Sequence, residues 1–273
     1  MSSFVASFPP VPPDTAYIAG TLYSSDNRYL AIGAKAERLL GGIDLEALDP
    51  VGGQSAWQVT MCTLVTILQY LENLPDQCAA AATRVRPDWK YALHLPAAYP
   101  GFEASRLCEF RRHVWRRPAA QLVLQRVISR LSQYIPIEPL PAVDEVVGAV
   151  CAVSRLERLI EAMHLVLEAV AVSAPDWLRQ IARPHWYERY NRLHLLHVLP
   201  RARKDQIELA RAINADAVYL LHAINTRQGP AVLPEVQHLW MEWDLQFSQS
   251  AQQLDWHSAG CADCNRACAL SAA

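Results

Sequence analysis

Glycine is scarce in this sequence, with 10 residues in 273, and runs of aromatic or β-branched side chains are few. Alanine, leucine and arginine are abundant, and they favour helices, which the 18 prolines would interrupt. Also missing is a stretch of about 18 uncharged apolar residues, the length that a membrane-spanning helix needs. We therefore predict an all-α protein without a membrane partner.

Signals for export are absent as well. The amino terminus has no basic region ahead of an apolar one, the arrangement that marks a secretory signal peptide. The seven cysteines are an odd number, and four of them are scattered through expected helices: Cys62, Cys78, Cys108 and Cys151. We expect these four to be small buried hydrophobic side chains in a reduced, cytoplasmic protein, not parts of a disulfide framework.

Charge is unevenly distributed, although the net charge is only -2. Between residues 84 and 130 there are ten basic and three acidic residues, a local charge of +7, so the rest of the chain carries -9. A compact basic segment suits a nucleic-acid backbone, because each neutralised phosphate releases counterions. A solvated helix face could have the same composition, and charge alone does not decide between the two.

Apolar residues recur every three or four positions in several segments, the spacing of helices that bury one stripe. Asp76 and Asp88 could each cap a helix, because an aspartate side chain accepts the free amides of a first turn. We expect helices at 57–74, 76–85, 104–115, 118–134, 144–172, 177–181, 185–196, 204–224 and 233–249, with a short helical piece after Asp88.

The helix expected at 144–172 is the longest, and its apolar residues follow a coiled-coil-like seam. The seam consists of Val146, Ala149, Val153, Leu156, Ile160, Met163, Leu167 and Val170. It runs for only three to four heptads, and helices of an ordinary bundle use the same spacing. We favour packing inside a bundle, with self-association along the seam as the alternative.

The segment from Thr83 to Val114, TRVRPDWKYALHLPAAYPGFEASRLCEFRRHV, resembles the N-terminal domain of bacterial insertion-sequence transposases, the InsH-like group. The resemblance extends over most of residues 55–256. It includes the end of the preceding helix, LQYLENLPD, and two later segments, DWLRQIARPHWYERYNR (176–192) and LPEVQHLWMEWDLQF (233–247). It implies a protein that recognises the double-stranded DNA of element ends. Such proteins continue into an RNase H-like catalytic domain, where this chain stops, so we expect a non-enzymatic, nucleoid-associated DNA-binding part.

The resemblance and the pattern together suggest five regions. Residues 1–55 are interrupted by prolines and glycines and are expected to form an N-terminal arm, with short helical pieces at about 28–40. A helical DNA-binding domain would cover 56–135, a proline-rich linker 136–143, and a second helical region 144–250. Residues 251–273 are expected to be a disordered tail.

The helix at 104–115 is the candidate recognition helix of a helix-turn-helix-like module. If Leu107, Phe110 and Val114 face the core, basic groups line its exposed side, with His113 among those flanking it. Such modules place the first residues of their second helix on base edges and basic side chains on phosphates. The base-edge candidates are Ser105, Arg106, Glu109 and Arg112, and the phosphate candidates are Arg116, Arg117, Arg84, Arg86 and Lys90. The connection from Pro87 to Gly101 is much longer than the usual turn.

Catalytic and metal-binding patterns are weak. None of the 27 acids stands in an apolar, β-branched strand that could begin a two-metal catalytic core, so we expect helix-surface residues and caps, and no cofactor. Four residues near the C-terminus could ligate zinc: His257, Cys261, Cys264 and Cys268. We favour the alternative that this tail is translated out of frame after a disrupted coding region. His194 and His197 have helical spacing but no third ligand nearby, and the expected aromatic core consists of His185, Trp186, Tyr187 and Tyr190.

Two functions from different classes remain after these considerations, with an inert remnant of a decayed element as a third possibility. The first is DNA binding as part of a transposase, with a homo-oligomer or the full-length transposase as a possible partner. The second is a helical interaction or scaffold protein that uses the seam and binds no nucleic acid.

Overall fold

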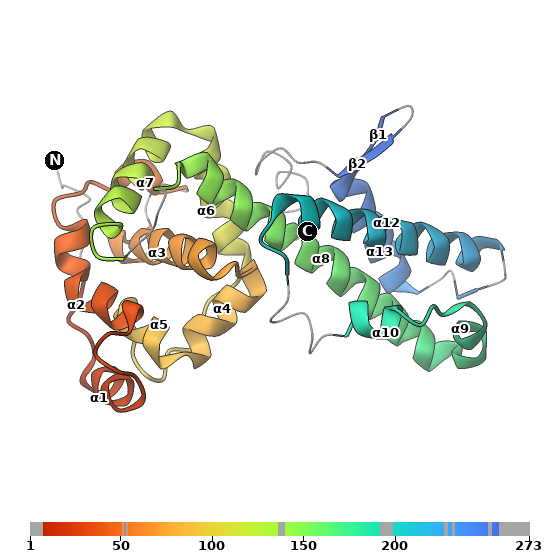
Figure 1. Ribbon diagram of the computed structural model, residues 1–273, viewed down its shortest axis with the longest axis horizontal. Coiled ribbons are helices and arrows are strands. Elements are labelled where there is room, and N and C mark those ends of the chain that lie inside the picture. Colours follow the sequence, from red (N-terminus) through yellow and green to blue (C-terminus); the bar gives the residue numbers. More distant parts are fainter. Residues whose placement is uncertain are drawn as a thin grey trace. The chain divides into compact units, whose positions relative to one another are not determined.

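The computed structural model describes residues 8–50, 52, 54–135, 140–191, 199–226, 229–230, 233–250 and 253–256 (Figure 1). These residues form an all-α protein, with one short two-stranded hairpin as the exception. Among them no helix has the length and apolar character needed to cross a membrane. The chain divides into two compact units, and the boundary between Val150 and Cys151 falls within the longest helix.

The first unit contains, in its described part, seven complete α-helices, one short 3-10 helix and the start of an eighth α-helix. They are α1 (Pro13–Leu22), α2 (Arg28–Leu40), the 3-10 turn η1 (Glu46–Leu48), α3 (Ala56–Glu72), α4 (Asp76–Val85), α5 (Pro87–Ala92), α6 (Ser105–Arg116), α7 (Pro118–Leu131) and the first residues of α8 (Val143–Ser173). Local sequence explains several ends. Ser55 and Gln58 form a reciprocal capping box at the start of α3, and Asn73 ends that helix in the left-handed conformation (φ 58°).

The segment expected to be an N-terminal arm is instead part of the core, which overturns that prediction for residues 13–48. α2 packs against α5 and α7, and α1 packs against α5. The apolar residues that these contacts and the following turn bury are Ile32, Leu39, Leu40, Ile43, Leu45 and Leu48, each at most 1% exposed. Prolines and glycines here mark turns between short helices, and burial of the α2 stripe holds the segment in place.

The second unit is built on the rest of α8 together with α9 (Pro175–Ile181), α10 (Trp186–Arg189), α12 (Arg203–Thr226), α13 (Pro234–Gln246) and the hairpin of β1 (Phe247–Ser250) and β2 (Gln253–Trp256). The strands are antiparallel, with Phe247 opposite Trp256. The helix expected to reach residue 249 therefore ends at Gln246. In the core of the second unit, apolar residues of α8 pack with Ile213 and Leu220 of α12 and with Leu239 of α13.

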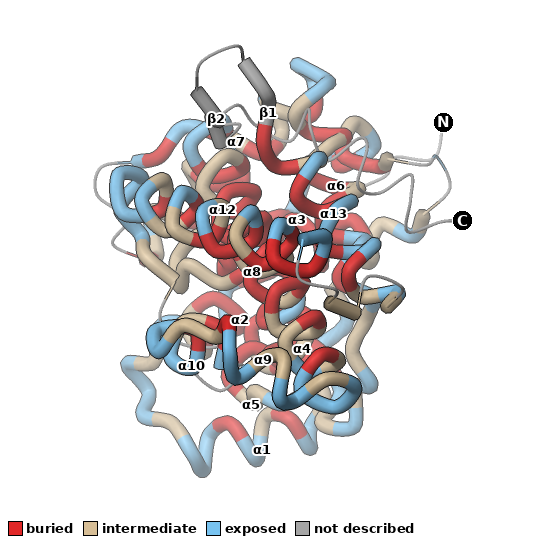
Figure 2. The backbone as a smooth tube through the Cα atoms, turned by 90° about the vertical axis from the view of Figure 1, so that its right-hand side faces the viewer, coloured by how far each residue is buried: buried red, intermediate tan, exposed pale blue. Residues whose placement is uncertain are grey.

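The seam of α8 is covered by the chain itself. Six of its eight residues are at most 2% exposed, and Ala149 and Leu167 are half-buried. Figure 2 shows α8 as a largely buried helix. Packing within a helical bundle is confirmed, and the surface needed by a scaffold protein that associates along this seam is not exposed.

Some predicted features lie outside the described residues. These are His194, His197, His257, Cys261, Cys264 and Cys268, residues 136–139 of the linker, and residues 251–252 and 257–273 of the expected tail. Residues 253–256, also assigned to that tail, form β2. In the described part of the chain, no group of three or more His, Cys, Asp or Glu side chains could hold a metal ion.

The close approach of α2 and α5 depends on the absence of a side chain at Gly33. A Cβ atom at this position would lie 2.5 Å from the carbonyl oxygen of Tyr91 and 2.6 Å from its ring. We predict that Gly33→Ala lowers the free energy of unfolding by about 1–3 kcal/mol, the usual cost of overpacking. Urea unfolding followed by circular dichroism measures this change.

Gly20 of α1 provides the matched control, because a Cβ atom there would meet nothing within 4 Å. Gly20→Ala should be neutral or stabilise the protein by up to about 1 kcal/mol through helix propensity. Equal effects of the two substitutions would contradict the packing described for Gly33.

Candidate nucleic-acid interface

The helix α6 is oriented as the sequence predicts. Leu107, Phe110 and Val114 are at most 1% exposed, and α6 packs with α3, α4 and α7. The predicted base-edge residues lie toward the other side of the helix: Ser105 and Arg106 are exposed, and Glu109 and Arg112 are half-buried. His113, expected to flank this exposed face, is instead buried, with its Nε2 atom 2.8 Å from the carbonyl oxygen of Ala47.

A buried ion pair fixes the inner side of α6. Arg111 is fully buried, and its Nη1 and Nη2 atoms donate to the two carboxylate oxygens of Asp76 at 2.7 and 2.6 Å. The side-chain amide of Gln69 donates to the same carboxylate at 2.9 Å. The bidentate pair joins α6 to α4, and Gln69 adds α3, so the three helices are connected at one carboxylate. Asp76 is therefore a counterion, not the helix cap that its position suggested.

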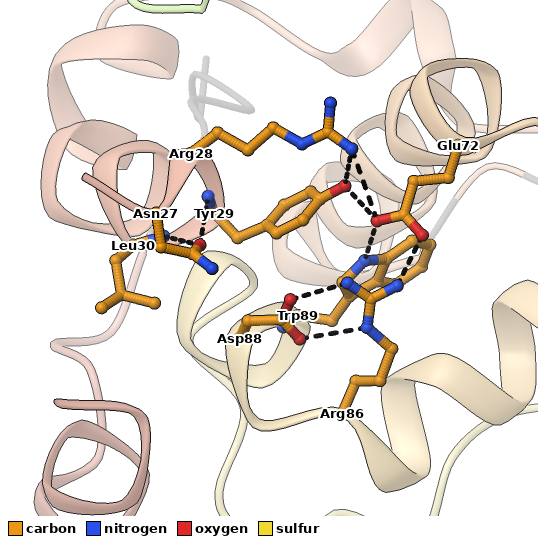
Figure 3. A network of polar contacts seen from close by, with 8 residues as sticks. All are labelled: Asn27, Arg28, Tyr29, Leu30, Glu72, Arg86, Asp88 and Trp89. Carbon is orange, nitrogen blue, oxygen red and sulfur yellow. Dashed lines mark hydrogen bonds and ion pairs between the residues drawn. The ribbon is translucent and has the colours of Figure 1, made fainter. Parts of the chain in front are cut away.

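A second network occupies the first unit around Glu72 of α3 (Figure 3). Its carboxylate accepts hydrogen bonds from Tyr29 Oη, Trp89 Nε1 at 3.1 Å and Arg86 Nη1 at 2.5 Å. Arg86 also makes two hydrogen bonds to Asp88, at 2.6 and 3.1 Å. Burial alone would raise the pKa of Glu72, but hydrogen bonds from Arg86, Tyr29 and Trp89 outweigh it and lower that pKa.

Two of the predicted phosphate contacts are therefore engaged inside the protein. Arg86 uses its guanidinium on Glu72 and Asp88 and lies 5.3 Å from the ring centres of Tyr29 and Trp89. Lys90 is 7% exposed, and its ammonium donates to the carbonyl oxygen of Ala97. These contacts argue against a phosphate-binding role for both residues, and a count of basic residues does not reveal such internal partners.

The ten basic residues of the +7 segment thus fall into two groups. Four make internal contacts: Arg86, Lys90, Arg111, and Arg130, which donates to the carbonyl oxygen of Gly41 at 2.9 Å. The other six, which we call the open arginines, are Arg84, Arg106, Arg112, Arg116, Arg117 and Arg126. In the part of the chain that the structure describes, none of the six has a carboxylate oxygen within 4.0 Å. Arg126 was missed, although its place between the buried α7 residues Leu124 and Val127 marks it as outward-facing.

Arg84 lies close to the chain that enters α6. A Cβ atom at Gly101, which has φ +92°, would lie 3.5 Å from Arg84 Cβ and 3.9 Å from Arg84 Cδ. The side chain of Arg84 therefore runs alongside Gly101, four residues before Ser105 begins the helix. No side chain caps the first turn of α6. The backbone amides of Arg106 and Leu107 donate instead to the carbonyl oxygens of Glu103 and Ala104. The aligned peptide dipoles of the helix add partial positive charge to that end.

The arrangement departs from a simple helix-turn-helix in its connection. α5 stands between α4 and α6 in the chain, and a further stretch, 93–104, leads into α6. The three helices nevertheless form one packed unit, because α4 contacts both α5 and α6.

The other predicted features have mixed outcomes. Cys62, Cys78, Cys108 and Cys151 are buried thiols that form no disulfide in the described part of the chain, as expected, and burial raises the pKa of Cys62 to about 11. The acids were expected on helix surfaces and at caps, but Glu72, Asp76, Asp88 and Asp216 serve as buried or half-buried counterions. In the expected aromatic core, Trp186 and Tyr190 are buried, whereas His185 and Tyr187 are exposed.

Comparison of the chain with protein-family models, curated proteins and solved structures finds no match in any of the three.

The ion pair of Arg111 with Asp76 makes a prediction about stability. Arg111→Ala should lower the free energy of unfolding by about 3–5 kcal/mol, because it leaves a buried carboxylate without its counterion. Arg116→Ala, which removes an exposed arginine from the same helix, should change it by less than about 0.5 kcal/mol. Chemical denaturation measures both values, and similar losses for the two variants would contradict the division into internal and open arginines.

The lowered pKa of Glu72 makes a prediction about acid stability. A carboxyl group with a depressed pKa stabilises the fold fully above its ordinary pKa of 4.5, and this contribution is lost as the pH falls through the lower, folded-state value. Stability of the wild type should therefore decline below about pH 4.5, and Glu72→Gln should flatten that part of the curve. Glu103→Gln, at an exposed position, is the control that should keep the wild-type decline. Identical curves for wild type and Glu72→Gln would rule out the network as an acid-sensitive element.

Proposed function

We propose that the chain binds double-stranded DNA through the exposed face of α6, as the DNA-binding part of an insertion-sequence transposase that recognises element ends. The observation that carries the proposal is the set of open arginines on and around α6, within the segment that resembles such transposases. Arginines without internal partners keep their full hydrogen-bonding capacity for phosphates and base edges. The helix-turn-helix-like role of α6 belongs to this proposal.

The residue roles follow from position. Ser105, Arg106, Glu109 and Arg112 lie on the first two turns of α6 and are proposed to contact base edges. Arg84, Arg116 and Arg117 lie near the two ends of the helix and are proposed to contact phosphates. Arg86 and Lys90 are not included in the proposed interface, because their side chains make contacts inside the protein.

The alternative function, a helical interaction protein without nucleic-acid binding, has less support. It relied on the seam of α8, which the chain covers itself. Partners beyond DNA, either a second copy or a full-length transposase, and a nucleoid-associated location stay predictions.

Salt dependence is the direct test of the proposed interface. If about four to six phosphates are contacted, the logarithm of the association constant should fall against the logarithm of salt concentration with a slope of roughly -4 to -5. Replacing both Arg116 and Arg117 by alanine should reduce that slope by up to about 2, because each lost phosphate contact removes roughly 0.9. Fluorescence anisotropy with a labelled duplex measures these slopes.

Arg179→Ala is the control, because this arginine is 72% exposed but lies on α9 in the second unit, where it pairs with Asp176. It should keep the wild-type slope. If the folded wild type does not bind duplex DNA near about 50 mM salt, the proposed function fails. Equal slope changes in the control and the double variant would place the interface elsewhere.

A further inference from the structure

The buried carboxylate of Asp216, on α12 in the second unit, holds a cluster of cationic side chains. Its side chain is 2% exposed. It accepts hydrogen bonds from Tyr190 Oη at 2.8 Å, from Arg189 Nη1, and from Arg183 Nη1 at 3.4 Å. His185 Nε2 lies 3.0 Å from the same carboxylate. Burial would raise the pKa of Asp216, but the surrounding hydrogen bonds lower it, so the carboxylate is ionised.

The charges of this cluster do not balance. One carboxylate faces two permanent guanidinium charges, so at least one positive charge is left over, whatever the state of His185. In the described part of the chain, no second carboxylate oxygen lies within 4.0 Å of Arg183 or Arg189. Glu188 is exposed on the same short helix, α10, but forms no ion pair with either of them at that distance.

Many hydrogen-bond donors in the cluster are also unused. A guanidinium has five N–H donors, and Arg183 and Arg189 each use one nitrogen on Asp216. The side chains of Arg183 and His185 are 38% and 43% exposed, and that of Arg189 is 26% exposed. Donors anchored on one side and open to solvent on the other are suited to a ligand with several acceptor oxygens.

The positions of these donors are fixed before any ligand arrives. The guanidinium of Arg183 lies 3.9 Å above the ring centre of Tyr219, and Asp216 holds it from one side. Stacking and ion pairing together restrict the rotamers of a long side chain, so less entropy is lost on binding. Planar guanidiniums match the oxygens of a phosphoryl group in a bidentate manner.

We propose that Arg183, His185 and Arg189, anchored by Asp216, form a binding site for a phosphoryl oxyanion. The site belongs to the second unit and does not rest on the proposed DNA interface of α6. A phosphoryl group can come from a nucleic-acid backbone or from a small phosphorylated molecule, and both present the same oxygens to the guanidiniums.

Calorimetric titration with inorganic pyrophosphate at constant ionic strength tests the site. The wild type should show saturable binding, and Arg183→Gln should weaken it by about tenfold or more, the loss typical of a charge-assisted hydrogen bond. His185→Gln should weaken binding as well, and it serves as the test if the circular dichroism of Arg183→Gln is not native. Arg179→Gln, which changes an exposed arginine of α9 outside the cluster, should bind pyrophosphate like the wild type.

Absence of saturable binding by the wild type overturns the site, and so does an equal loss in Arg179→Gln and Arg183→Gln. A parallel titration with duplex DNA identifies the source of the phosphate. A salt slope smaller by about 1 in Arg183→Gln assigns the site to the DNA backbone, and an unchanged slope with weakened pyrophosphate binding assigns it to a small phosphorylated molecule. A wild type that binds pyrophosphate but no DNA retains this site and rejects only the proposed function.

Discussion

The buried ion pair between Arg111 and Asp76 is the constraint on which the proposed interface depends. A guanidinium that is fully buried needs its partner in one geometry, because an unpaired charge inside a protein is strongly destabilising. The pair therefore fixes the rotation of α6 about its own axis relative to α4. With Arg111 directed inward, Arg112 and Arg116 are placed toward solvent. The orientation of the face proposed to contact DNA is therefore set by the Arg111–Asp76 pair on the opposite side of the helix.

Neighbouring arginines in this chain thus have different roles. Arg111 and Arg86 are each held by carboxylates and contribute to the packing of helices. Arg112 is one residue further along α6 and has no such partner among the described residues. The acids that pair with the internal arginines Arg86 and Arg111 are Glu72 of α3, Asp76 of α4 and Asp88 of α5. Part of the positive charge of the segment is therefore neutralised inside the fold.

Much of the helical organisation could be predicted from the sequence. Local signals such as apolar spacing, prolines, turn residues and potential caps placed α3, α4, α6, α7, α8 and α12 within a few residues of their observed bounds. Long-range pairing was not predictable in the same way. Glu72, which pairs with Arg86, and Asp76, which pairs with Arg111, lie 14 and 35 residues from their partners, and the burial of α2 depends on α5, more than 40 residues later.

The predicted site was affected by the same limitation. Exposure of Arg106 and Arg116 follows from helical periodicity, whereas the internal use of Arg86 and Lys90 required the positions of Glu72 and the Ala97 carbonyl group. The cation cluster on Asp216 was missed for a related reason. His185 and its neighbours were assigned to an aromatic core, and their carboxylate lies about one helix further along the chain, 27 residues after Arg189.

Amide hydrogen exchange of the whole chain, with and without saturating duplex DNA, tests the central claim most directly. Contacts along the exposed face of α6 should slow exchange in peptides that cover residues 102–117, where the first turn of the helix has amides without side-chain caps. Peptides from α2, whose apolar stripe is buried in the core, should not change. Exchange in 102–117 that is unaffected while DNA is bound would contradict the account.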